Sequence, residues 1–108
     1  MICRMWKATA ATLEQALEYQ GVALGTIIPE IEARNIHGFR QIDMLRYLLP
    51  DGTYQFVTLM WFDDEDSVRL FSGTDDEVSY LPSEITSVLS QYDERVMHYE
   101  VIARRPQE

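Results

Sequence analysis

The tripeptide Pro50-Asp51-Gly52 separates two long apolar segments, and no other feature of the sequence restricts the possible folds as strongly. Proline presets φ, aspartate tolerates the inner position of a turn, and glycine accepts a positive φ that a β-carbon would disfavour. The tripeptide therefore predicts a hairpin that makes strands 39–49 and 53–62 antiparallel neighbours.

The second of these strands carries apolar residues on both faces. Phe56 and Met60 share one parity, and Val57 and Leu59 share the other. A strand of this kind is buried on both sides, so something must cover each face of the sheet. We interpret Phe56 as a residue of the face that no helix covers.

The chain before the hairpin predicts one strand and a helical region. Residues 2–8 are rich in large apolar side chains and indicate an opening strand. Thr12 is a suitable helix N-cap, with Gln15 three residues later as its capping-box partner. Glycines and Pro29 interrupt residues 19–34, so this region is either one kinked helix or two helices.

The chain after the hairpin predicts a second helix and a last strand. Asp63 or Asp64 caps the helix, Gly73 ends it, and Val68, Leu70 and Phe71 turn inward. Residues 75–77 suggest an acidic turn, Pro82 suggests the start of a short helix, and residues 95–103 alternate as a fourth strand.

The expected order of elements is β-α-β-β-α-β. This order is that of the ferredoxin-like α+β fold, in which both helices pack on one face of a four-stranded antiparallel sheet. The other face would remain apolar and bare. We expect it to meet the same face of a second copy, giving a homodimer that closes a dimeric α/β barrel.

Composition sets further limits on the chain. Its 108 residues suit a single domain over 1–103 with a polar tail at 104–108. Eighteen acidic against nine basic residues give a net charge of -9, which argues against nucleic acid and membrane surfaces as partners. The single Cys3 cannot form an intrachain disulfide, and no signal-peptide run is present, so we expect a cytoplasmic protein.

Four segments resemble the antibiotic biosynthesis monooxygenase-like domains of the dimeric α/β barrel superfamily. They are Met1-Ile2-Cys3-Arg4-Met5-Trp6, Tyr19-Gln20-Gly21-Val22, the junction from Trp61 to Ser67, and Val96-Met97-His98-Tyr99-Glu100-Val101. The resemblance implies a homodimer with an apolar pocket between sheet and helices. It also implies, for the founding members, oxygenation of phenolic substrates by molecular oxygen without a cofactor.

Alternation on the first and last strands of the chain predicts a polar cluster that suits this chemistry. Arg4 and Trp6 share a face of the first strand, and His98 and Glu100 share a face of the last, which is its neighbour. His98 would act as general base, Arg4 as donor to a phenolate, and Glu100 as a partner of either. Trp6 and Trp61 would form apolar walls for a small aromatic ligand.

The same residues allow a noncatalytic interpretation. Arg4 and Glu100 would then form a cross-strand ion pair, His98 would be structural, and both tryptophans would belong to the core. The chain would be a ligand-binding or interaction module with the same fold. Tyr80, Tyr92 and Tyr99 offer phenolic donors, but their spacing selects none.

Two alternatives that require a metal fit the sequence poorly. The haem-degrading relatives use an asparagine, a tryptophan and an iron-ligating histidine, yet residues 70–80 contain no histidine. The acidic run 63–66 lacks the alternating ligands and central glycine of a calcium loop, and it suits a helix N-terminus. We therefore expect no cofactor and no metal site.

Overall fold

The computed structural model describes residues 1–73, 79 and 81–108, so the acidic turn expected at 75–77 lies outside it. Along the chain the elements are β1 (Ile2–Ala10), α1 (Leu13–Val22), the π-helical segment η1 (Ala23–Ile27), α2 (Ile28–Ala33), β2 (Phe39–Leu48), β3 (Tyr54–Phe62), α3 (Glu65–Ser72), α4 (Ser83–Thr86), β4 (Gln91–Tyr92) and β5 (Met97–Glu100). Among the described residues, no helix has the length and apolar character needed to cross a membrane.

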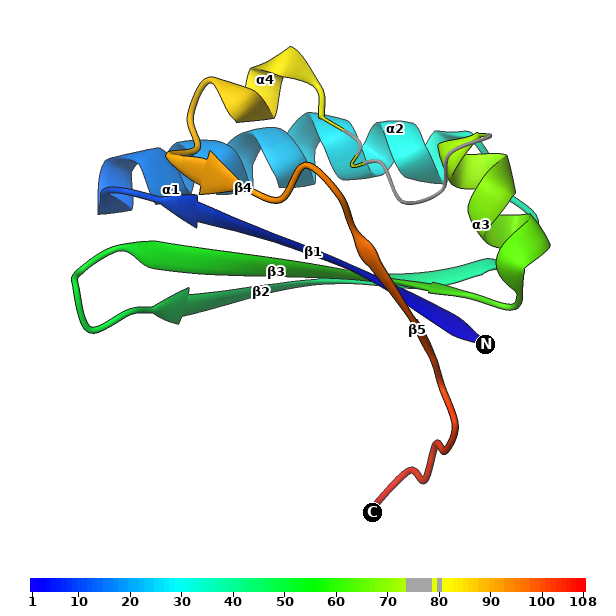
Figure 1. Cartoon of the computed structure of the whole chain (residues 1–108). Coiled ribbons are helices and arrows are strands. Elements are labelled where there is room, and N and C mark those ends of the chain that lie inside the picture. Colours follow the sequence, from blue (N-terminus) through cyan, green and yellow to red (C-terminus); the bar gives the residue numbers. More distant parts are fainter. Residues whose placement is uncertain (74–78, 80) are drawn as a thin grey trace.

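The strands form one antiparallel sheet with the order β2-β3-β1-β4, and β5 also pairs with β1. Figure 1 shows the helices on one side of this sheet, with α1 and α2 lying along it in a single line. The other side carries no described helix, and the sheet is open. This arrangement confirms the ferredoxin-like α+β fold and the hairpin between β2 and β3.

The last strand differs from the prediction, because it is broken into β4 and β5. From Met97 to Tyr92 the chain takes five steps, while its partner takes only three steps from Met5 to Ala8. The two additional residues form a bulge, so the described residues make five strands where the sequence predicted four. A shift of two residues preserves side-chain parity, and His98 consequently stays on the face of Arg4.

Both main helices begin at the caps that the sequence indicates. Thr12 Oγ1 accepts a hydrogen bond from the backbone N–H of Gln15 at 3.1 Å. Asp64 Oδ1 accepts one from the backbone N–H of Ser67 at 2.9 Å, and Gly73 ends α3. The prediction that Leu70 turns inward is wrong. Leu70 is 58% exposed, because α3 buries only the side that carries Val68 and Phe71.

The helical region before β2 is continuous. Of the two possibilities that its glycines and Pro29 left open, a single helix or two separate helices, the structure has the first. The π-helical segment η1 joins α1 to α2 without a break, and Pro29 lies in the first turn of α2. A π-helical turn accommodates an additional residue within a helix. The widened turn faces the sheet and contributes to the cavity described below.

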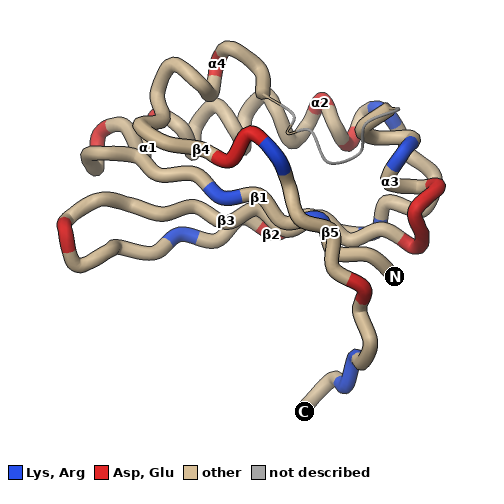
Figure 2. Tube along the Cα trace, in the orientation of Figure 1, with Lys and Arg blue, Asp and Glu red and all other residues tan. Residues whose placement is uncertain are grey.

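β3 lies in the middle of the sheet and is apolar on both faces, as predicted. It carries no charged residue and is tan along its length in Figure 2. The assignment of its faces requires a correction, because Phe56 is 1% exposed and packs against Tyr19 of α1 at a ring-centroid distance of 4.7 Å. Phe56 thus lies in the helix-covered core, and Val57 and Leu59 have the parity of the bare face.

Gly38 lies immediately before β2, and its contact with Ser67 can be tested by measuring the stability of a variant. Its φ is +84°, and a Cβ built there would lie 1.9 Å from Ser67 Oγ and 2.7 Å from Ser67 Cβ. Gly52 has a similar φ of +88° but no atom within 4 Å of such a Cβ. We expect Gly52→Ala to destabilise the protein by about 1–2 kcal/mol through backbone strain alone.

Gly38→Ala should cost about 1–3 kcal/mol more than Gly52→Ala, because it adds a steric clash to the same strain. Urea unfolding of the two variants measures the difference directly. Equal losses of unfolding free energy would show that the close approach between Gly38 and Ser67 does not contribute.

Candidate functional site

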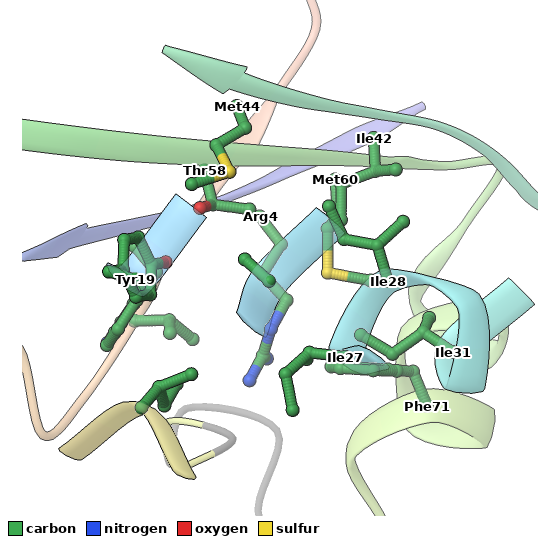
Figure 3. Close-up of a pocket in the computed structure, with 14 residues that line it drawn as sticks. Arg4, Tyr19, Ile27, Ile28, Ile31, Ile42, Met44, Thr58, Met60 and Phe71 are labelled. Atoms are coloured by element: carbon green, nitrogen blue, oxygen red, sulfur yellow. The ribbon is translucent and has the colours of Figure 1, made fainter. Parts of the chain in front are cut away.

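A cavity of about 60 Å³ lies between the sheet and the helices. A single water needs roughly 10–15 Å³ on this scale, so the cavity as it stands has room for a few waters, and an aromatic ring needs the lining side chains to move apart. Most of its lining is apolar (Figure 3), and the lining residues are Arg4, Trp6, Tyr19, Ala23, Ile27, Ile28, Ile31, Ile42, Met44, Thr58, Met60, Phe71, Ile85 and Val96.

Arg4 brings the only charged side chain to this lining among the described residues. It projects from β1 toward the helices (Figure 3) and is 3% exposed. Its guanidinium carbon lies 5.1 Å from the centre of the Phe71 ring, within the range of a cation–π contact. Its guanidinium can donate charge-assisted hydrogen bonds to a ligand oxygen that carries negative charge.

His98 lies beside Arg4, as the strand alternation predicted. The two residues face each other across β1 and β5, and Arg4 Nη1 donates to His98 Nε2 at 2.9 Å. Arginine has no acceptor, so His98 accepts this bond in its neutral form with its proton on Nδ1. His98 is not one of the residues that line the cavity.

Trp6 lines the cavity and is held in place by the bulge between β4 and β5. Its indole Nε1 donates to the backbone carbonyl of Asp93 at 2.6 Å. That carbonyl also accepts from Ser79 Oγ at 2.6 Å. The bulge thus positions the indole, whose ring centre lies 6.5 Å from that of Tyr19.

Tyr19 and Thr58 are polar residues of the cavity that the sequence pattern did not indicate. Tyr19 is 3% exposed, and burial raises the pKa of its phenol. The sequence feature that could have identified Tyr19 is its helical spacing from other inward-facing residues. Tyr19 lies on the inward stripe that continues through Ala23, Ile27 and Ile31.

The structure separates Trp61 and Glu100 from the cavity. Trp61 is the cross-strand partner of Cys3 on the opposite sheet face, where its Nε1 donates to Asp43 Oδ2 at 2.8 Å. Glu100 has the parity of His98 but pairs with Ile2 and is exposed near the end of β5. Glu100 therefore lies on the predicted face of β5 but does not contact Arg4, because it is two residues beyond His98 along the strand.

Cys3 lies on the side of the sheet away from the cavity. It is 6% exposed, and burial raises the pKa of its thiol, with a further contribution from the charge of Asp43. Within the described ranges, no group of three or more His, Cys, Asp or Glu residues could hold a metal ion.

Comparison with known proteins finds structural likeness without sequence likeness. No protein-family model and no curated protein matches the chain. Among solved structures it is similar to a monooxygenase from the gene ActVA-Orf6 of Streptomyces coelicolor, in complex with the ligand nanaomycin D. The TM-score is 0.68 at 15% identity, over 99% of this chain and 92% of that one.

Two further solved structures have the same fold. One is a candidate antibiotic biosynthesis monooxygenase from Bacillus cereus, with a TM-score of 0.64, 12% identity and coverage of 98% and 97%. The other comes from Deinococcus radiodurans, with a TM-score of 0.60, 14% identity and coverage of 100% and 99%. The chain is a ferredoxin-like α+β domain with a cavity beneath its helices. More narrowly, it has the fold of the antibiotic biosynthesis monooxygenases, which confirms the resemblance at the level of fold.

Proposed function

We propose that the cavity widens to bind a flat aromatic ligand of one or two rings that carries an acidic oxygen. The observation that carries this proposal is the buried guanidinium of Arg4 in a lining that is otherwise mostly aliphatic and aromatic. The apolar side chains favour the ring system, and the guanidinium favours the ionised form of its phenol or carboxylic acid.

We further propose that the chain oxygenates phenolic ligands with molecular oxygen and without a cofactor. In this reaction a phenol loses its O–H hydrogen and one ring C–H hydrogen. One atom of O₂ bonds to that ring carbon to form a quinone, and the other leaves as water with both hydrogens. Arg4 would stabilise the phenolate that donates electrons to oxygen, and the surrounding side chains would exclude water.

In this proposal His98 is a positioning residue, because its Nε2 already accepts a hydrogen bond from Arg4. The variants His98→Gln and His98→Ala separate this role from that of a general base. Glutamine retains an acceptor oxygen for Arg4 but cannot exchange a proton at neutral pH. We expect affinity for 2-naphthoate to fall by less than about threefold in His98→Gln and by about tenfold in His98→Ala.

Oxygen uptake with 1-naphthol provides the readout for catalysis. We expect His98→Gln to retain most of the uptake of the unmodified protein. Complete loss in both variants, with 2-naphthoate binding preserved in His98→Gln, would instead assign the proton transfer to His98 itself.

We also propose that two copies associate through the bare sheet face. Leu45 and Tyr47 of β2 and Met97 and Tyr99 of β5 are all large side chains between 44% and 63% exposed on that face. Exposed apolar surface of this extent favours association. A second copy with the same face is the partner that closed symmetry supplies.

The function is tested by ligand binding and oxygen uptake in the same preparation. Quenching of Trp6 fluorescence by 2-naphthoate reports binding, and Trp61→Phe should leave that signal in place because Trp61 lies on the opposite face. With 1-naphthol we expect oxygen consumption equal to the 1,4-naphthoquinone formed, above the rate in buffer. Binding without uptake would indicate a noncatalytic binding module, and absence of both would reject the proposed site.

A further inference from the structure

The cavity has a second polar position besides Arg4. It is formed by the hydroxyls of Tyr19 on α1 and Thr58 on β3, and both residues line the cavity. Figure 3 shows the two side chains on one side of Arg4, while Ile27, Ile31 and Phe71 lie on the other. The cavity therefore has hydroxyl groups on one side of Arg4 and only apolar side chains on the other side shown.

The chemistry of this hydroxyl pair suits a neutral ligand oxygen. Burial raises the pKa of the Tyr19 phenol, so the phenol keeps its proton at physiological pH. Each hydroxyl has one hydrogen and two lone pairs. The pair can therefore donate a hydrogen bond to a carbonyl or hydroxyl oxygen, and it also offers lone pairs to a hydroxyl donor.

The register of the sheet sets the separation between this pair and Arg4. Arg4 is directly opposite Met60, and Thr58 is two residues along β3 on the same face. Such diagonal neighbours lie roughly 7–8 Å apart at the backbone. A substituted ring system is long enough to contact both positions. Trp6 offers no competing donor, because its indole N–H is bonded to Asp93.

We propose that the Tyr19–Thr58 pair selects ring systems that carry a second oxygen at the end away from the acidic group. This inference rests on the proposed function and narrows its substrate class. A ligand without the second oxygen would leave the hydroxyl pair covered by apolar carbon and without an acceptor from the ligand. Sites that hydrogen-bond a ligand hydroxyl discriminate against the analogue that lacks it for this reason.

The test compares two ligands that differ by one hydroxyl, 6-hydroxy-2-naphthoate and 2-naphthoate. We expect the unmodified protein to bind the hydroxylated acid about tenfold more tightly, the effect of one neutral hydrogen bond. In the double variant Tyr19→Phe/Thr58→Val, which removes both hydroxyls, the ratio of the two dissociation constants should fall below about twofold. Tyr92→Phe is the matched control, because Tyr92 lies on β4 outside the cavity lining and should keep the full ratio.

Each outcome separates this inference from the function on which it rests. A ratio near one in the unmodified protein, with both acids bound, would overturn the selection while leaving the Arg4 site intact. A tenfold ratio that persists in the double variant would also overturn it, since the two hydroxyls would then make no contact with the ligand oxygen. If neither acid bound, the proposed function itself would fail.

Discussion

Replacing Arg4 with glutamine should weaken the binding of 2-naphthoate by about 100-fold or more. Removing one partner of a buried, hydrogen-bonded charge pair typically costs 2–5 kcal/mol, because the remaining charge stays in an apolar environment. Arg4 is 3% exposed, so water cannot replace its guanidinium easily. Isothermal titration calorimetry measures the change directly.

Two controls show whether this loss reports the charge. Arg4→Lys keeps the charge but not the planar fork of donors, so its affinity should fall between those of the unmodified protein and Arg4→Gln. The neutral ligand 2-naphthol, at a pH where it is protonated, should lose less than about fivefold in Arg4→Gln. An equal loss for the acid and the neutral ligand, with a lowered melting temperature, would mean that Arg4 only supports the fold.

Introducing a charge at Leu45 should convert the proposed homodimer to monomer. Leu45 is 50% exposed on the bare sheet face, where it pairs with Val57 of β3. Because the side chain is half exposed in a single copy, Leu45→Asp should not unfold that copy. Within a dimer the same carboxylate would be buried without a partner, which is strongly unfavourable.

Leu17→Asp is the matched control for this experiment. Leu17 is 52% exposed on α1, and the helices lie on the other side of the sheet (Figure 1). Light scattering after size-exclusion chromatography should give the mass of a dimer for Leu17→Asp and of a monomer for Leu45→Asp. A dimer in both variants, or a monomeric unmodified protein, would contradict association through this face.

The sequence predicted the order of elements well because local chemistry determines it. The Pro50-Asp51-Gly52 turn, the Thr12 cap and the Gly73 stop each act within a few residues, and each is found where expected. The bulge after Tyr92 was not predicted, since it depends on how a late segment fits against β1, the first strand of the chain.

The sequence predicted which face of a strand points toward the helices where one face was polar. It gave the wrong face where both faces were apolar. Arg4 and His98 meet because each alternates with less polar neighbours on its own strand. On β3 both parities are apolar, so no pattern distinguished buried Phe56 from the residues of the bare face. Which face of β3 is buried depends on which face the helices cover, and the sequence of the strand alone does not indicate this.

The cavity itself could not be predicted, because it is formed by elements that are distant in the chain. Tyr19 was hidden within a helical stripe, and Thr58 is an ordinary strand residue until α1 places Tyr19 against it. Trp61 was selected for its type, yet its parity directs it away from the cavity. A constellation of this kind requires tertiary packing in addition to periodicity.

A crystal of the protein soaked with 6-bromo-2-naphthoate tests the Arg4 cavity most directly. Anomalous scattering from bromine locates the ring without assuming a pose. We predict one peak inside the cavity on the side of Tyr19 and Thr58, with the carboxylate within hydrogen-bond distance of the Arg4 guanidinium. A peak only on the outer surface, or an empty cavity at a concentration that saturates the fluorescence change, would contradict the assignment of this site.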